Sequence, residues 1–180
     1  MKILKTFVAQ AAGTLVCTLV LTATAFAQQN AKLSDPEIAS VAVVANQIDI
    51  DQGQLAQQKS KDQAVQDFAK TMINDHRSVI DQASALVKKL NVTPKDNAMS
   101  RKLKADAAKT MKSLRTKSGA AFNQAYINNE VAYHKAVINA VENVLIPQAQ
   151  NAELKSLLQN VLPALRAHLE HAQMVQKNMK

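Results

Sequence analysis

The sequence predicts an all-α protein, and three observations lead to this fold class. Glycine and proline are scarce, with three glycines and four prolines in 180 residues. Alanine, glutamine, lysine and leucine are abundant, and this composition favours helix over sheet. Apolar residues recur at steps of three or four along most of the chain, which is the spacing of one helix face. We therefore expect four long amphipathic helices packed as an up-and-down four-helix bundle, with an extra amphipathic helix between the second and third.

The N-terminus is typical of a secretory signal peptide. Lys2 and Lys5 form a positive segment, and an uncharged apolar run follows to about Leu21. Ala25 and Ala27 then give the small-x-small pattern of a cleavage site. The apolar run is short for a membrane span. We predict export to the periplasm or outer envelope with cleavage after Ala27, which leaves residues 28–180 as one helical domain.

Two alternatives for this segment stay open, an uncleaved anchor and a lipoprotein attached through Cys17. Val16 is a poor residue to precede a lipidated cysteine, and Cys17 lies inside the apolar run. Cys17 is the only cysteine of the chain. Cleavage would remove it, so the mature protein would have no disulfide and no thiol chemistry. Its stability would then come from packing.

The positive charge is concentrated in one segment. The formal charge is +8, and removal of Lys2 and Lys5 lowers it to +6. Residues 97–118 carry all of that remainder, because seven basic residues there oppose only Asp106: Arg101, Lys102, Lys104, Lys109, Lys112, Arg115 and Lys117. Such a basic face could contact an anionic membrane surface, and the alternative is an ordinary solvated helix face. Nucleic acid is disfavoured, since few aromatic residues are present to stack on bases.

The first two helices are marked by capping and turn signals. Ser34 and Glu37 form a capping box with Pro36 in the first turn, so the first helix begins there. The second begins near Asp62 and ends near residue 91. Because the break between them is very short, we expect antiparallel neighbours. Gly53 inside the first helix predicts a close approach by a neighbouring element.

The basic segment is the predicted extra helix, because apolar residues line one thin edge of it. The third helix of the bundle carries an apolar stripe from Phe122 and is expected to stop before Pro147. The fourth begins near Asn151 and has the most regular apolar spacing. Pro163 lies inside it, removes one backbone donor and should bend it.

Polar residues interrupt the apolar stripes of all four bundle helices. His76 and His168 take stripe positions, Glu130 does the same with His134 one turn later, and Asp49 lies beside the stripe of the first helix. Counted from the turns at 1.5 Å per residue, these side chains fall at similar heights. Imidazole nitrogens and carboxylate oxygens at one level are suitable ligands for a divalent metal ion such as zinc or iron. We therefore single out Asp49, His76, Glu130, His134 and His168 as candidate metal ligands.

A structural explanation of the same residues remains open. Buried histidines often only satisfy hydrogen bonds, here with Asp49 or Asp75, and a polar layer can fix the register of a bundle. Asp75 points about 100° away from His76 around the helix. It is therefore expected to be a surface carboxylate and not a metal ligand.

Several of these residues form a pattern that resembles the domain-of-unknown-function 4142 family. The pattern comprises Gly53-x-Leu-Ala, Phe68-Ala-x-x-Met-x-x-Asp-His76, Phe122-x-x-x-Tyr with His134, and Leu162-Pro-x-Leu-x-x-His168. The resemblance implies an exported protein with a ferritin-like bundle and no established activity. The family commonly has Glu at the position of Asp49 and often Asp at that of Asn123, and the shorter Asp49 weakens a bridging role.

The motif of di-iron bundles is missing despite the ferritin-like resemblance. Such sites use Glu-x-x-His on two helices, but Ile73, Val131 and Leu165 stand three residues before His76, His134 and His168. This excludes a di-iron oxidase and leaves a mononuclear or purely structural site. Phosphate-binding loops, a Gly-x-Ser-x-Gly elbow and a mature cysteine nucleophile are also absent from the sequence. An exported metal- or ligand-binding protein is therefore the first hypothesis. A non-catalytic envelope or stress interaction protein is the alternative, and an enzyme is less favoured.

Overall fold

The computed structural model describes residues 32–179, so the predicted signal peptide, its cleavage site and Cys17 lie outside the described residues. The described chain is helical from end to end and has no strand. Its elements are α1 (Asp35–Lys59), α2 (Gln63–Lys89), α3 (Ala98–Arg115), α4 (Gly119–Ala140), the π-helical η1 (Val141–Leu145), the short α5 (Ile146–Gln148) and α6 (Ala152–Asn178). The predicted all-α fold is therefore confirmed.

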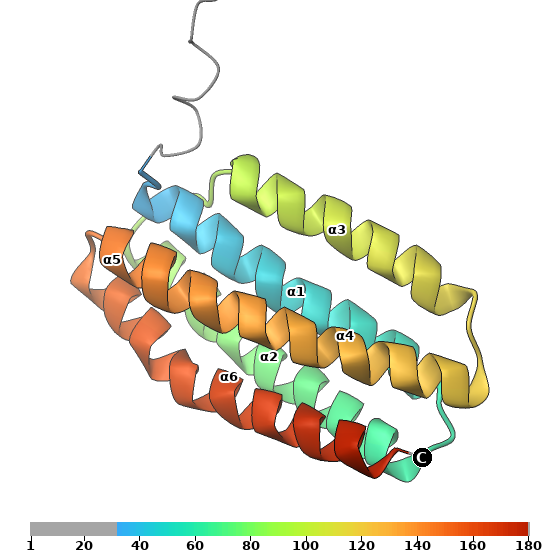
Figure 1. Cartoon of the computed structure of the whole chain (residues 1–180). Coiled ribbons are helices and arrows are strands. Elements are labelled where there is room, and N and C mark those ends of the chain that lie inside the picture. The colour runs from blue at the N-terminus through green and yellow to red at the C-terminus, as the bar shows by residue number, and fades with distance from the viewer. Residues whose placement is uncertain (1–31, 180) are drawn as a thin grey trace, which may run out of the picture. The chain divides into compact units, whose positions relative to one another are not determined.

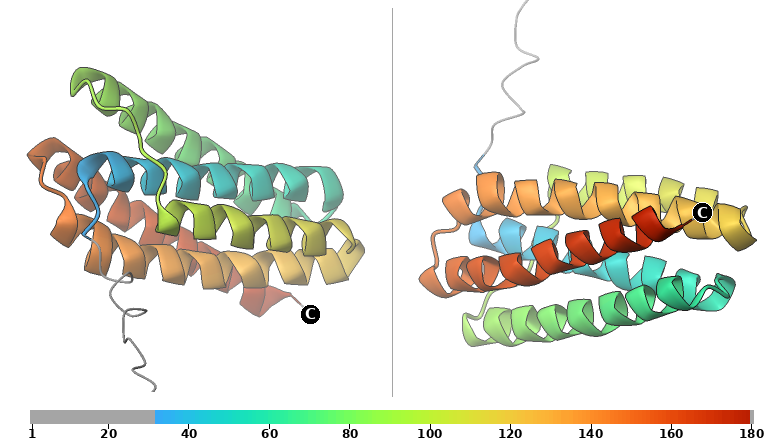
Figure 2. Two further views of the ribbon diagram at one scale, coloured as in Figure 1. Left: turned by 90° about the horizontal axis from the view of Figure 1, so that it is seen from above. Right: turned by 60° about the horizontal axis from the view of Figure 1, so that its bottom comes forward.

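Four long helices, α1, α2, α4 and α6, make the bundle (Figure 1). Helix α1 packs on α2, α4 packs on α6, and the two pairs meet through α2 with α6 and α1 with α4. Helix α3 lies outside this arrangement against α1 and α4, as predicted for the extra helix (Figures 1 and 2). No helix among residues 32–179 combines the length and apolarity of a membrane span.

The start of α1 is fixed by the predicted capping box and by a contact across the bundle. The Ser34 backbone N–H donates to Glu37 Oε2 at 3.0 Å, and its hydroxyl donates to the same oxygen at 2.6 Å. Asp35 accepts hydrogen bonds from the backbone N–H groups of Gln150 and Asn151 at 2.8 and 2.9 Å. The first turn of α1 thus also holds the loop that begins α6.

The turn between α1 and α2 is as short as predicted. Ser60 ends α1, and Asp62 caps α2 by accepting from the backbone N–H of Val65 at 3.1 Å. Gly53 lies at a close approach of α1 to α2. A Cβ atom built on it would lie 3.0 Å from Ile73 Cγ1 and 3.1 Å from the carbonyl oxygen of Ala69. The glycine is therefore needed for close helix packing.

Replacement of this glycine by a branched residue should separate α1 from α2. We expect Gly53→Val to lower the free energy of unfolding by about 1–3 kcal/mol, because the backbone of Ala69 cannot move away without shifting α2. Chemical denaturation measures this, with Ala64→Val on the exposed face of α2 as the control. Equal stabilities of Gly53→Val and wild type would contradict the close approach.

The expectation that the third bundle helix stops before Pro147 is wrong. The chain stays helical from Gly119 through the π-turns of η1 to Gln148. Pro147 is tolerated because it lies in the first turn of α5, where a backbone N–H group would have no acceptor within that helix. Asn151 then caps α6 by accepting from two backbone N–H groups, and α6 continues through the exposed Pro163.

The core consists of two apolar clusters with a polar layer between them. One cluster contains the large aromatic side chains Phe68, Phe122 and Tyr126. The other, at the opposite end of the bundle, is aliphatic and includes Ile38 and Leu145. The residues that separate the two clusters along each bundle helix are the polar ones singled out from the sequence.

Candidate metal centre

All five predicted side chains lie in one buried layer of the bundle. Asp49 comes from α1, His76 from α2, Glu130 and His134 from α4, and His168 from α6. None of them is more than 6% exposed, and Glu130 and His134 are fully buried. The heights inferred from helix rise therefore place these residues correctly.

Ligand atoms converge in two overlapping groups within this layer. One ring nitrogen from each of His76, His134 and His168 lies within 4.8 Å of the others. The second group joins Asp49, Glu130 and His134, again with one ligand atom each within 4.8 Å. His134 belongs to both groups, so the histidines and the carboxylates form one continuous cluster.

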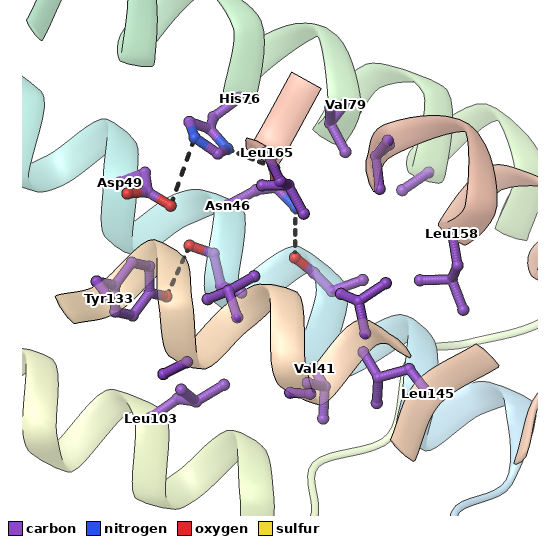
Figure 3. Close-up of a pocket in the computed structure, with 18 of the residues that line it drawn as sticks. Val41, Asn46, Asp49, His76, Val79, Leu103, Tyr133, Leu145, Leu158 and Leu165 are labelled. Atoms are coloured by element: carbon purple, nitrogen blue, oxygen red, sulfur yellow. Dashed lines mark hydrogen bonds and ion pairs between the residues drawn. The ribbon is translucent and has the colours of Figure 1, made fainter. Parts of the chain in front are cut away.

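Each histidine is held through one ring nitrogen by an oxygen acceptor. His76 Nδ1 donates to Asn46 Oδ1 at 2.7 Å, and Asp49 Oδ2 lies 3.5 Å from His76 Nε2 (Figure 3). His134 Nδ1 donates to the backbone oxygen of Glu130 at 3.1 Å. These bonds fix the tautomers and leave the Nε2 lone pairs of both rings free. Partners of this kind typically orient metal-binding histidines.

His168 is held by Asp75, which the sequence offered as a hydrogen-bond partner for a buried histidine without indicating which histidine. His168 Nε2 lies 2.9 Å from Asp75 Oδ2. The Asp75 side chain is 49% exposed, so it is a surface carboxylate as expected, yet it also reaches the layer. Asp75 reaches the layer because α6 packs beside α2, and Asp75 lies on the side of α2 that faces α6. The adjacent Asp75-His76 pair was the one available signal.

The remaining nitrogens and oxygens of the layer lack hydrogen-bond partners. Residues 32–179 offer no hydrogen-bond partner to the following buried atoms: His76 Nε2, His134 Nε2, His168 Nδ1, Asp49 Oδ1, both Glu130 carboxylate oxygens and the Tyr126 hydroxyl. Buried polar groups are normally paired, and an unpaired one costs about 1–3 kcal/mol. Almost all of these atoms are electron-pair donors. A cation is therefore the species that would satisfy them together.

The pKa shifts show how strongly burial suppresses charge here. Burial and the neighbouring His134 and His168 lower the pKa of His76 to about 3. Burial also lowers the pKa of His168, against the opposing effect of Asp75. Burial and the charge of Glu130 raise the pKa of Asp49. The rings of His76 and His168 are thus neutral at physiological pH, the form in which imidazole binds a metal.

The His76 shift predicts acid sensitivity of the metal-free protein. In the unfolded chain His76 binds a proton below about pH 6.5, and in the folded protein only below about pH 3. The unfolded state therefore holds more protons in this window, and stability falls as the pH is lowered through it. Denaturation of chelator-treated protein from pH 7 to 4 should show this loss.

A variant isolates the contribution of His76 to that pH dependence. His76→Gln should flatten the decline, because glutamine does not titrate. Asp49 acts in the opposite sense, since its raised pKa makes stability fall as the pH rises above about 3.8. Wild type and variant share this Asp49 effect, so their difference reports on His76. Identical pH profiles of the two proteins would contradict the assignment.

Two tyrosines border the layer, and the fourth histidine does not join it. Burial raises the pKa of both Tyr126 and Tyr133, with Glu130 and Asp49 adding to the effect. The Tyr133 hydroxyl donates to the backbone oxygen of Ala45 at 3.1 Å, which links α4 to α1 (Figure 3). The ring of His171 lies edge-on to Phe68 instead, with centroids 5.2 Å apart.

Comparison with known proteins shows which family this chain belongs to. None of the curated proteins matches the chain. A solved structure titled "CopM in the Cu(II)-bound form" is similar in fold, with a TM-score of 0.63 and 16% sequence identity over 82% of this chain and all of that chain. The family model described as Domain of unknown function (DUF4142) matches residues 21–175. The chain therefore belongs to the DUF4142 family.

Proposed function

We propose that this protein binds one divalent transition-metal ion in the buried layer between its four bundle helices. The observation that carries the proposal is the arrangement of His76, His134 and His168. Each has one nitrogen held by an oxygen acceptor and the other nitrogen free, with ring nitrogens of the three converging within 4.8 Å. Three oriented neutral imidazoles are a ligand set for a metal, whereas a network that only fixes register would pair these nitrogens with donors.

Two buried carboxylates lie beside the histidines and would supply oxygen ligands. Asp49 Oδ2 lies 3.5 Å from the free Nε2 of His76, whereas Glu130 Oε2 lies 3.5 Å from His134 Nδ1, the nitrogen that donates to the Glu130 backbone oxygen. Two buried carboxylates side by side are unfavourable, as the raised pKa of Asp49 indicates. A divalent cation would balance their charge and supply a partner for their oxygens.

The donor set narrows the choice of ion. Imidazole with carboxylate suits Zn²⁺, Cu²⁺ and Fe²⁺, and among these the affinity order favours Cu²⁺. The bundle of similar fold was solved with Cu(II) bound, which supports the same choice for this chain. We therefore propose Cu²⁺ first, with Zn²⁺ and Fe²⁺ as the competitors to compare.

Metal analysis of the purified protein tests this function. After loading with each ion and dialysis, the wild type should retain close to one ion per chain, and His76→Ala and His168→Ala should retain little. His171→Ala is the matched control, because His171 lies on α6 outside the layer and should retain the ion like wild type. A wild type that retains no metal would overturn the proposal.

Asp75 should act as a positioning residue for the same ion. Its carboxylate fixes the tautomer of His168 from outside the layer. Asp75→Asn should weaken metal affinity by about 10–100-fold while stoichiometry at saturation stays the same, as for other groups that orient a ligand. Competitive titration against a chelator of known affinity measures the change. An unchanged affinity would show that the bond to His168 is only structural.

We also propose that the protein acts outside the cytoplasm. The charged, apolar and small-residue parts of the N-terminus support export with cleavage after Ala27. N-terminal sequencing of the protein from an envelope fraction tests this. A sequence beginning at Gln28 supports cleavage, and one beginning at Met1 contradicts it.

A second candidate function uses the exposed basic face of α3. Arg101 and Lys104 pair with Asp96, and Lys102 and Lys109 share Asp106. Lys112 and Arg115 of α3 and Lys117 just after it form no salt bridge with any carboxylate of residues 32–179. We propose that these cations contact anionic membrane. Co-sedimentation with anionic vesicles should weaken with salt, and equal binding to neutral vesicles would contradict this mechanism.

A further inference from the structure

A cavity of about 700 Å³ extends from the polar layer into the aliphatic half of the bundle (Figure 3). Its walls follow α1 from Ala39 to Gln52 and α6 from Leu154 to His168. At 1.5 Å per residue these stretches are roughly 20 Å long. The cavity therefore runs along the helices.

The distribution of side-chain size explains why the cavity lies in this half of the bundle. The three large aromatic residues of the core, Phe68, Phe122 and Tyr126, all belong to the other half. The cavity walls instead contain many small residues: Ala39, Ala42, Ala45, Ala83, Ala132, Ala136, Ala140 and Ala164. Protein interiors ordinarily leave few voids larger than a water molecule. A space of several hundred cubic ångströms is the size of a ligand site.

The walls are mainly aliphatic, which specifies the kind of ligand. Labelled examples in Figure 3 are Val41, Val79, Leu145, Leu158 and Leu165. Such walls offer few partners to water and favour hydrocarbon, since removing apolar area from water stabilises a complex by about 25 cal/mol per Å². An aliphatic cavity that runs along the helices can hold a flexible hydrocarbon chain lengthwise.

Helix α3 covers the seam between α1 and α4 and forms part of the same cavity. Met99, Leu103 and Ala107 on its inner edge line the cavity. Lys102 also lines it, and its side chain is 76% exposed. Its ammonium group pairs with Asp106, which lines the same opening, so these two charges balance where the cavity meets solvent. The role of α3 in this proposal is to close one side of the cavity.

We propose that this cavity binds one unbranched aliphatic chain. The hydrocarbon lies along the aliphatic half of the bundle, and its polar end stays at the solvent side, beside the Lys102–Asp106 pair. A free fatty acid and a phospholipid acyl chain share this chemistry. The proposal rests on the aliphatic walls and not on metal binding, although Asp49, His76 and His168 line the end of the cavity at the polar layer.

Titration with the fluorescent fatty acid cis-parinaric acid tests the proposal. We expect saturable binding by wild type and displacement by palmitate. Ala83→Phe places a ring in the cavity from α2 and should weaken binding at least about tenfold. Ala85→Phe is the matched control, because Ala85 is exposed on the same helix, is absent from the cavity wall and should bind like wild type.

A second variant keeps the test interpretable if Ala83→Phe fails to fold. Val161→Phe narrows the cavity from α6 and should weaken binding in the same way, provided that its circular dichroism matches wild type. Absence of saturable binding by wild type would overturn the proposal, as would wild-type affinity in both folded variants. Mass spectrometry of an organic extract of detergent-free protein then distinguishes the sources, since a free fatty acid and a phospholipid differ in mass.

Discussion

Addition of Cu²⁺ or Zn²⁺ to the metal-free protein should raise its melting temperature by about 5–10 °C. A ligand at 100 times its dissociation constant stabilises the folded state by about 2.7 kcal/mol, and each kcal/mol corresponds to about 2–4 °C at this chain length. The ion stabilises only the folded state here, because four helices from distant parts of the chain supply its ligands.

His134 is the residue whose loss should remove this shift most completely. It is fully buried and belongs to both groups of converging ligand atoms. His134→Gln keeps much of the side-chain volume, and differential scanning calorimetry should show almost no metal-dependent shift for it. His171→Gln should keep the wild-type shift, since His171 packs against Phe68 outside the layer. A full shift in His134→Gln would place the ion elsewhere on the protein.

Replacement of Glu130 should separate a metal site from a purely structural polar network. We expect Glu130→Gln to stabilise the metal-free protein by about 1–3 kcal/mol, because it removes a carboxylate buried beside Asp49 without hydrogen-bond partners. The same variant should bind metal more weakly than wild type. Stability and affinity thus change in opposite directions, as is common where a site is built for function.

The structural alternative predicts the opposite sign for the metal-free protein. If the layer only fixed the register of the helices, Glu130→Gln would lower stability by breaking the network. Urea denaturation of chelator-treated protein measures the sign. Glu142→Gln is the control, because Glu142 pairs with Arg166 near the surface and its loss should change stability by less than about 1 kcal/mol. Destabilisation by Glu130→Gln alone would favour the structural alternative.

The fold was largely predictable because its signals are local. The capping box at Ser34, the cap at Asp62 and the cap at Asn151 each lie where a helix begins. The heights of the five polar residues followed from helix rise and the positions of two turns. The end of the third bundle helix was not predictable in this way. Pro147 does not end the helix, because η1 places it in the first turn of α5, where its missing N–H group costs little.

The helices, the close approach at Gly53 and the common level of the five polar residues were predictable from the sequence. All of these features depend on spacing within one helix or across a short turn. Which nitrogen of each ring is free, and the bond between Asp75 and His168, became visible only in the packed bundle. The tertiary structure alone also showed the cavity beside the layer. These features depend on how helices pack around one another, and spacing along a single helix carries no information about which neighbour lies against which side.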